Sequence, residues 1–166
     1  MTQVTDTRRH DVDWLRASAF LLLILYHVGM YYVADWDYHV KSPRQLEGLQ
    51  DLMILSNQWR MSLLFFLSGL ALALVRGRYS GASLLRLRSM RLLVPLVFGM
   101  LVVVPPQLYF ELRQKFGFDG SYFEFMREYL DLGTTLAPEK QYYLALITWN
   151  HLWFLPYLWC YSVLVL

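Results

Sequence analysis

Three ionisable residues accompany the first apolar stretch of the sequence, the run 14–33: Asp13, Arg16 and His27. Charged groups are rare inside a membrane span and usually face a partner or a cavity. Asp13 and Arg16 are three residues apart, so they share a helical face and can form an ion pair. Arg16 and His27 are eleven apart, which brings them to within about 20° of one face and about 16 Å from each other along the axis. The spacing predicts a polar stripe on which the histidine can serve as general base near neutral pH.

The second apolar stretch, 52–75, carries Arg60 and Ser68. Arg60 lies about eight residues from the predicted outer end of this stretch and His27 about six from that of the first, so we expect similar depths. Arg60 would then stabilise an oxyanion or hold His27 unprotonated by repulsion. Ser68 should lie deeper, near the level of Arg16. The alternatives are that Arg60 extends outward to the membrane surface and that Ser68 only lets two helices approach.

The elements that must position these residues are membrane-spanning helices. The chain is 57% hydrophobic and 17% charged, whereas soluble domains are about 25% charged. About 20 apolar residues cross a bilayer as a helix, because backbone groups in lipid must bond internally. We therefore predict an all-α, polytopic transmembrane helix bundle with spans at about 14–33, 52–75, 92–112 and 149–166.

The loops predict how the chain is oriented. Arginines crowd the predicted loop 76–91, which the positive-inside rule makes cytoplasmic together with the N-terminus. The loops 34–51 and 113–148 then face outward. The net charge of only +2 gives no reason to expect a nucleic-acid partner, and the scattered histidines give no metal-ligand spacing. The lipid bilayer is the partner that the composition implies.

Three local features refine this outline. Pro105 and Pro106 fall inside the third span, where proline removes a backbone donor and kinks a helix. The outward loop 113–148 is expected to hold a short amphipathic helix at about 122–130. The last residues, 158–166, are still apolar, which we interpret as a longer membrane protein of which this chain is the N-terminal part.

The stripe suits transfer of an acyl group across the membrane. A general base at His27 can take the proton of a hydroxyl that attacks an activated carbonyl. A basic group about 16 Å toward the cytoplasm could bind the phosphates of a long donor such as acyl-CoA. The hypothesis is an enzyme that takes acyl-CoA from inside and modifies an acceptor outside.

The ordered motifs resemble the acyltransferase family 3 membrane proteins. DVDWLRASAFLLLILYH resembles their first helix, with an arginine, ten residues and a histidine at Arg16 and His27. FFLSGL, which contains Ser68, is similar to their SG element. RLRSMRLLVPLVFG, with Arg88 and Arg91, resembles their basic loop, and HLWFLPYL, from His151, resembles the entry to a later helix. Within the family the chain is most similar to the branch of glucans biosynthesis protein C, which is associated with succinylating periplasmic glucans.

The resemblance implies roles and surroundings for this chain. His27 would be catalytic with Arg16 as its partner, and Arg88 and Arg91 would lie near the entry of CoA. We add Asp13, Arg60, Ser68 and His151 as substrate or CoA contacts. The expected activity is transfer of an acetyl or succinyl group to a hydroxyl of a periplasmic or cell-surface glycan, in a bacterial inner membrane and without a bound cofactor. Such enzymes have about ten helices, so this N-terminal part, 1–166, is expected to be inactive alone.

Two other classes of protein remain open. A transporter or channel would use intramembrane histidine and arginine to line a path for protons or solutes. It would be favoured by acidic residues in mid-span or by inverted repeats, and the sequence shows neither. A non-catalytic membrane scaffold would predict that His27→Ala changes only stability.

Overall fold

The computed structural model describes residues 9–141 and 144–166 and contains no β-strand among them. Three of its helices are long and apolar enough to cross a membrane, His10–Tyr32, Leu49–Arg76 and the continuous helical stretch Gly81–Lys115. This confirms the predicted fold class. The chain forms two compact units, one made of residues 1–36 and 41–74 and the other of residues 37–40 and 75–166.

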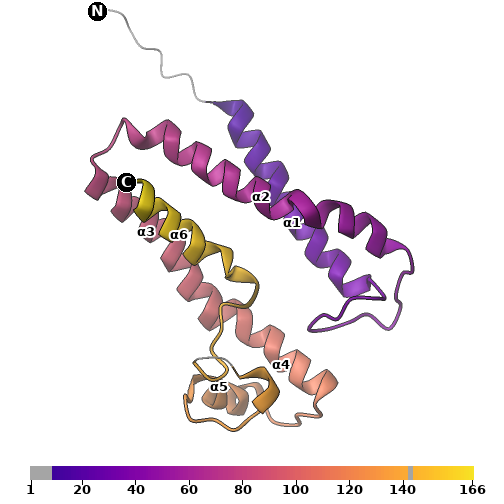
Figure 1. Cartoon of the computed structure of the whole chain (residues 1–166). Helices are drawn as coiled ribbons and strands as arrows, with labels where there is room; N and C mark the ends of the chain where they lie inside the picture. Colours follow the sequence, from indigo (N-terminus) through magenta and orange to yellow (C-terminus); the bar gives the residue numbers. More distant parts are fainter. Residues whose placement is uncertain (1–8, 142–143) are drawn as a thin grey trace, which may run out of the picture. The chain divides into compact units, whose positions relative to one another are not determined.

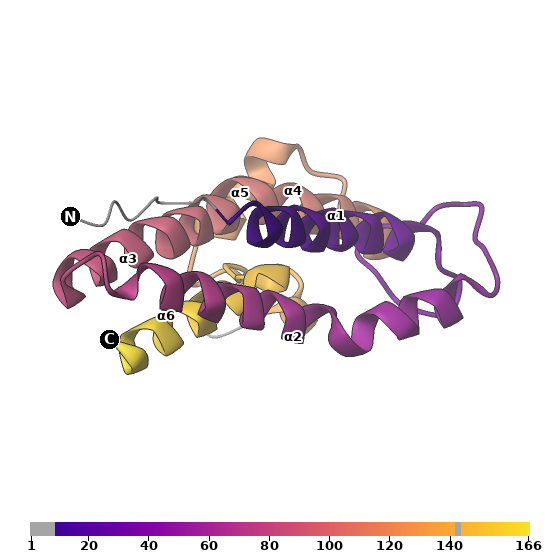
Figure 2. The same cartoon turned by 90° about the horizontal axis from the view of Figure 1, so that it is seen from above.

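The first unit is a pair of helices, α1 (His10–Tyr32) and α2 (Leu49–Arg76), drawn in indigo and magenta in Figures 1 and 2. Ala19 packs with Leu64 and Leu67, whereas near the other end of α1 a side chain at Gly29 would meet Met53. Residue numbers thus rise along α1 as they fall along α2, so the helices are antiparallel. α1 is apolar on most of its surface, as expected of a helix in lipid.

The second unit begins with a departure from the predicted loop 76–91. Residues from Gly81 onward are helical, and α3 (Gly81–Phe98) continues without a loop into the third predicted span. Ser80 explains the early start, because its hydroxyl accepts a hydrogen bond from the Ser83 backbone N–H and so caps the helix. Arg86, Arg88 and Arg91 therefore lie on a helix, and only residues 77–80 separate α2 from α3.

Pro105 and Pro106 of the third span are accommodated by a π-helix, η1 (Gly99–Val103), followed by α4 (Val104–Lys115). Within η1 the Val104 N–H bonds to the Gly99 carbonyl, five residues back. By the same pattern the Met100 carbonyl would accept from residue 105, which is a proline and has no N–H. The Tyr129 hydroxyl donates to this carbonyl instead, at 2.7 Å.

Replacing Tyr129 by phenylalanine should therefore destabilise the protein. The side chain is fully buried and the Met100 carbonyl would lose its donor, which we expect to cost about 1–3 kcal/mol. The measurement is the midpoint of thermal unfolding in detergent, with the exposed Tyr157→Phe as matched control. Equal midpoints for the two variants would contradict this role of Tyr129.

α5 (Tyr122–Leu130) coincides with the short helix expected in the loop 113–148. Ser121 and Glu124 form a capping box at its start. Phe125 and Tyr129 of α5 pack with Leu108 and Leu112 of α4 and with Leu146, forming the core of this part of the unit. α5 therefore folds back on α4.

α6 (Phe154–Val165) packs antiparallel to α3 (Figure 1). Trp159 Nε1 donates to Ser89 Oγ at 2.8 Å, and Leu152, just before α6, lies against Gly99. The predicted span 149–166 thus comprises a short 3₁₀ turn, η3 (Asn150–Leu152), and a helix of 12 residues. Since about 20 residues are needed to cross a bilayer, the fourth span stays a prediction.

Candidate active site

His27 lies on α1 with its side chain half-buried. Its Nδ1 is 2.7 Å from the carbonyl oxygen of Leu23, one turn earlier on the same helix. A carbonyl only accepts, so Nδ1 is the donor, and in the neutral form of the ring the lone pair would lie on Nε2. The contact therefore fixes the tautomer in which Nε2 can act as base.

Arg60 lies on α2 and is 93% buried, although it is an arginine. Its guanidinium carbon is 3.3 Å from the centre of the Tyr26 ring, a cation–π contact, and its Nη2 donates to Asn57 Oδ1 at 3.1 Å. Arg60 Nε and Nη1 are buried without a hydrogen-bond partner among the described residues. A guanidinium with most of its donors unpaired in this way is costly unless a ligand supplies acceptors.

In the structure Arg60 contacts Tyr26, the residue before His27, and not the imidazole of His27. Tyr26 precedes His27 in the chain, and the two rings meet edge to face with centroids 6.0 Å apart. The Tyr26 hydroxyl donates to Asn57 Oδ1 at 3.4 Å, so Asn57 holds both Tyr26 and Arg60. The depths of His27 and Arg60 thus agree with the expectation from the sequence, whereas their catalytic roles stay predictions.

The other predicted residues of the first unit lie at the level of the N-terminal part of α1, away from His27. Asp13 and Ser68 are half-buried and Arg16 is exposed. Because α1 is one unbroken helix, Arg16 and His27 do share a stripe, about 16 Å apart. The antiparallel order that opposes Ala19 to Leu67 puts Ser68 near the level of Arg16.

The remaining predicted residues, Arg88, Arg91 and His151, belong to the second unit. Arg88 Nε donates to Ser162 Oγ at 3.1 Å and so ties α3 to α6, and Arg91 on the same helix is exposed. His151 is half-buried in the turn η3. Arg88 therefore has a packing role beside its predicted role near the CoA entry.

The prediction from sequence missed two groups of residues. The first group is the pair Tyr26 and Asn57, which contact Arg60. Asn57 lies three residues before Arg60 and so shares its helical face, a spacing from which their contact could have been predicted. The second is centred on Glu111, an acidic residue inside the predicted span 92–112. Its position at the end of an apolar run, one residue before the last of the predicted span, was the signal for a buried carboxylate with partners.

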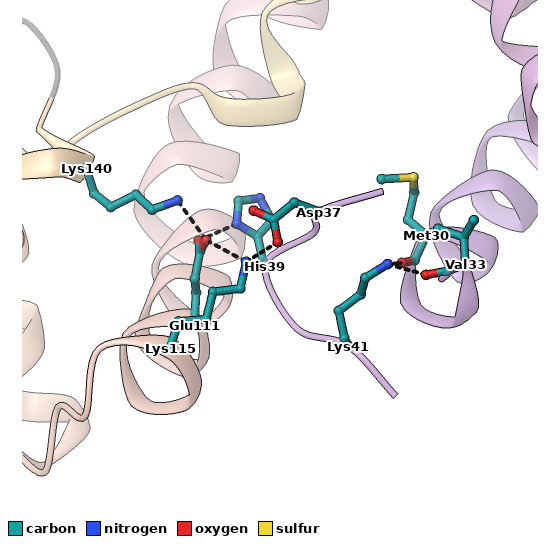
Figure 3. Close-up of polar contacts among 8 residues, drawn as sticks. All are labelled: Met30, Val33, Asp37, His39, Lys41, Glu111, Lys115 and Lys140. Carbon is teal, nitrogen blue, oxygen red and sulfur yellow. Dashed lines mark hydrogen bonds and ion pairs between the residues drawn. The ribbon is translucent and has the colours of Figure 1, made fainter. Parts of the chain in front are cut away.

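The Glu111 carboxylate is 98% buried and has three basic neighbours (Figure 3). His39 Nδ1 donates to Oε2 at 2.5 Å, and Lys140 Nζ donates to Oε1 at 2.8 Å, with Lys115 Nζ 3.5 Å from the same oxygen. Lys115 also donates to Asp37 at 2.6 Å, and this hydrogen bond lowers the pKa of the Asp37 carboxyl. In this group, which we term the Glu111 cluster, every charge has a partner of opposite sign.

Lys41 makes a separate contact in the first unit (Figure 3). Its ammonium donates to the carbonyls of Met30 and Val33, at the C-terminal end of α1. A cation at this end satisfies carbonyls that the helix leaves unpaired and complements the helix dipole. The contact fixes the end of α1 a little beyond His27.

The helices and the ionisable side chains inside them define a polytopic membrane protein. The family model of acyltransferase family 3, described as an acyltransferase domain, matches residues 9–166. The chain therefore belongs to the acyltransferase family 3 and is a membrane acyltransferase. No curated protein and no solved structure gave a match.

Proposed function

We propose that the protein is an O-acyltransferase of a bacterial plasma membrane, with its N-terminus in the cytoplasm. It moves an acetyl or succinyl group from cytoplasmic acyl-CoA to a hydroxyl of an extracytoplasmic glycan. Membership of the acyltransferase family supports the class of enzyme. The resemblance of its motifs to the branch of glucans biosynthesis protein C supports a glycan as acceptor.

The observation that carries this proposal is the guanidinium of Arg60. It is buried, stacked on the residue next to His27, and held by Asn57, with Nε and Nη1 unpaired in the part of the chain that the structure describes. Fixed donors without acceptors are suited to the negative charge that develops on a carbonyl oxygen during acyl transfer. A residue that served only to pack two helices would not need these donors.

The reaction assigns one task to each group. His27 Nε2 takes the proton of the acceptor hydroxyl as its oxygen attacks the thioester carbon. The carbonyl π electrons move onto oxygen, and Arg60 stabilises this oxyanion by its N–H donors. When the carbon–oxygen double bond re-forms, the carbon–sulfur bond breaks and the CoA thiolate takes the proton from His27. An ester and CoA–SH are the products, and no other reactant is needed.

The donor would lie along the stripe of α1. Arg16, about 16 Å from His27, is exposed and would contact the phosphate-bearing end of CoA with Ser68 beside it and Asp13 orienting it. Arg88 and Arg91 would attract the same phosphates at the cytoplasmic surface. His151 would contact the acceptor. These roles rest on the family motifs and on the positions of the residues along their helices.

The test is acyl transfer in membrane vesicles of known orientation that contain the full-length protein. Radiolabelled acetyl-CoA or succinyl-CoA is supplied to the cytoplasmic face, and alkali-labile label is measured in envelope glycans. We expect one of the two donors to label the glycan, and only from that face. If vesicles with and without the protein give equal label with both donors, the proposed reaction is wrong.

A further inference from the structure

The Glu111 cluster leads directly to the segment that carries His151. His39 Nδ1 donates to Glu111 Oε2, and its other ring nitrogen, Nε2, lies 2.9 Å from Asn150 Nδ2, within hydrogen-bond distance. Asn150 begins the turn η3, whose second residue is His151. A chain of two hydrogen bonds thus joins a buried carboxylate on α4 to this turn.

The turn η3 is held at both of its ends. Asn150 has a φ of +43°, a left-handed conformation that asparagine tolerates better than most residues but that still carries strain. Its side chain is fixed by His39. At the other end, Leu152 fits against Gly99, where a Cβ would lie 2.2 Å from Leu152 Cδ1. His151 lies between these two anchors.

The Glu111 cluster is suited to fixing the turn η3 in place rather than to transferring protons. Both oxygens of Glu111 accept hydrogen bonds, and both ring nitrogens of His39 are engaged. Because Glu111 is 98% buried and both ring nitrogens of His39 are already bonded, neither group is available to a substrate. Glu111 needs its basic neighbours because a buried carboxylate without partners is strongly destabilising.

We propose that His39 and Glu111 are positioning residues that act through Asn150 to fix His151 for the acceptor. This inference rests on the proposed function in so far as it takes His151 to contact the acceptor. The tie from Glu111 through His39 to the turn η3 is independent of which acyl group is transferred.

Two variants of His39 test whether its hydrogen bonds position the turn η3. In His39→Gln the side-chain amide can donate to Glu111 and form a second hydrogen bond to Asn150, so both contacts of the imidazole can be kept. In His39→Leu both hydrogen bonds are lost. We expect His39→Leu to raise the KM for the glycan acceptor by about two- to tenfold, the factor that one hydrogen bond corresponds to, with the KM for acyl-CoA unchanged. His39→Gln should stay near the parent protein. Equal loss in both variants, or a KM change for acyl-CoA alone, would overturn the proposal.

A second readout does not depend on enzyme activity. In a Cys160→Ser background, which removes the native cysteine, His151→Cys places a thiol in the turn, and its rate of maleimide modification is measured in membranes. Adding His39→Leu should raise this rate by about two- to tenfold because the turn opens more often. The exposed Asp119→Asn, in the same unit, is the matched control and should leave the modification rate unchanged.

An unchanged rate in His39→Leu would overturn the proposal even if acyl transfer is confirmed. A raised rate in a protein that transfers no acyl group would refute the proposed function and retain the tie.

Discussion

His27→Ala should lower acyl transfer by about 100- to 10,000-fold, the contribution typical of a general base. The residue would no longer take the proton of the acceptor hydroxyl, while the binding of acyl-CoA along α1 should be retained. We therefore expect kcat to fall with little change in the KM for acyl-CoA. The measurement is labelled glycan ester formed per amount of protein in the membrane.

The control for this result is His10→Ala, an exposed histidine at the start of the same helix. It should leave both activity and membrane level unchanged. Full transfer by His27→Ala would remove the imidazole from the mechanism. A parallel fall of activity and protein level would instead assign His27 a packing role, through its hydrogen bond to the Leu23 carbonyl.

Arg60→Met should lower kcat by about 100- to 1,000-fold, the loss typical of removing one oxyanion donor. Methionine keeps the length and the apolar part of the side chain but removes every N–H. If the buried guanidinium serves the transition state, the KM values should change much less than kcat. Single-turnover transfer from labelled acyl-CoA would isolate the chemical step.

The stability of Arg60→Met distinguishes catalysis from packing. The substitution removes Nε and Nη1, two buried, unpaired groups that cost about 1–3 kcal/mol each. It also removes the cation–π contact with Tyr26, worth about 0.5–2 kcal/mol, and the hydrogen bond to Asn57, worth about 1.5–3 kcal/mol. These contributions nearly cancel, so the unfolding midpoint should hardly change although activity is lost. Arg44→Met, at an exposed arginine of the same unit, is the control and should change neither quantity. A large fall in the midpoint with kcat retained would show that Arg60 only holds α1 and α2 together.

The sequence by itself determined the helical class, the helices that bear Asp13, Arg16, His27, Arg60 and Ser68, and the stripe of Arg16 and His27. These properties follow from local rules: apolar length sets a membrane helix, and 3.6 residues per turn sets which side chains share a face. The helix 122–130 and the matching depths of His27 and Arg60 were predictable for the same reason. The start of α3 at Gly81 was not, because the arginine-rich stretch was interpreted by charge, whereas the cap at Ser80 decided the helix.

Only the tertiary structure decided which side chains meet. Arg60 reaches the Tyr26 ring because of how α1 and α2 rotate about their axes, which helical periodicity within either one does not fix. His39 meets Glu111 across 72 residues and Asn150 across 111, since the chain path returns to α4 twice. The π-helix at Gly99–Val103 likewise depends on Tyr129, a residue well beyond it that supplies the hydrogen bond Pro105 cannot. Contacts at such separations follow from the packing of whole helices. A charged residue in an apolar stretch therefore predicts from the sequence that it has partners, but only the tertiary structure identifies them.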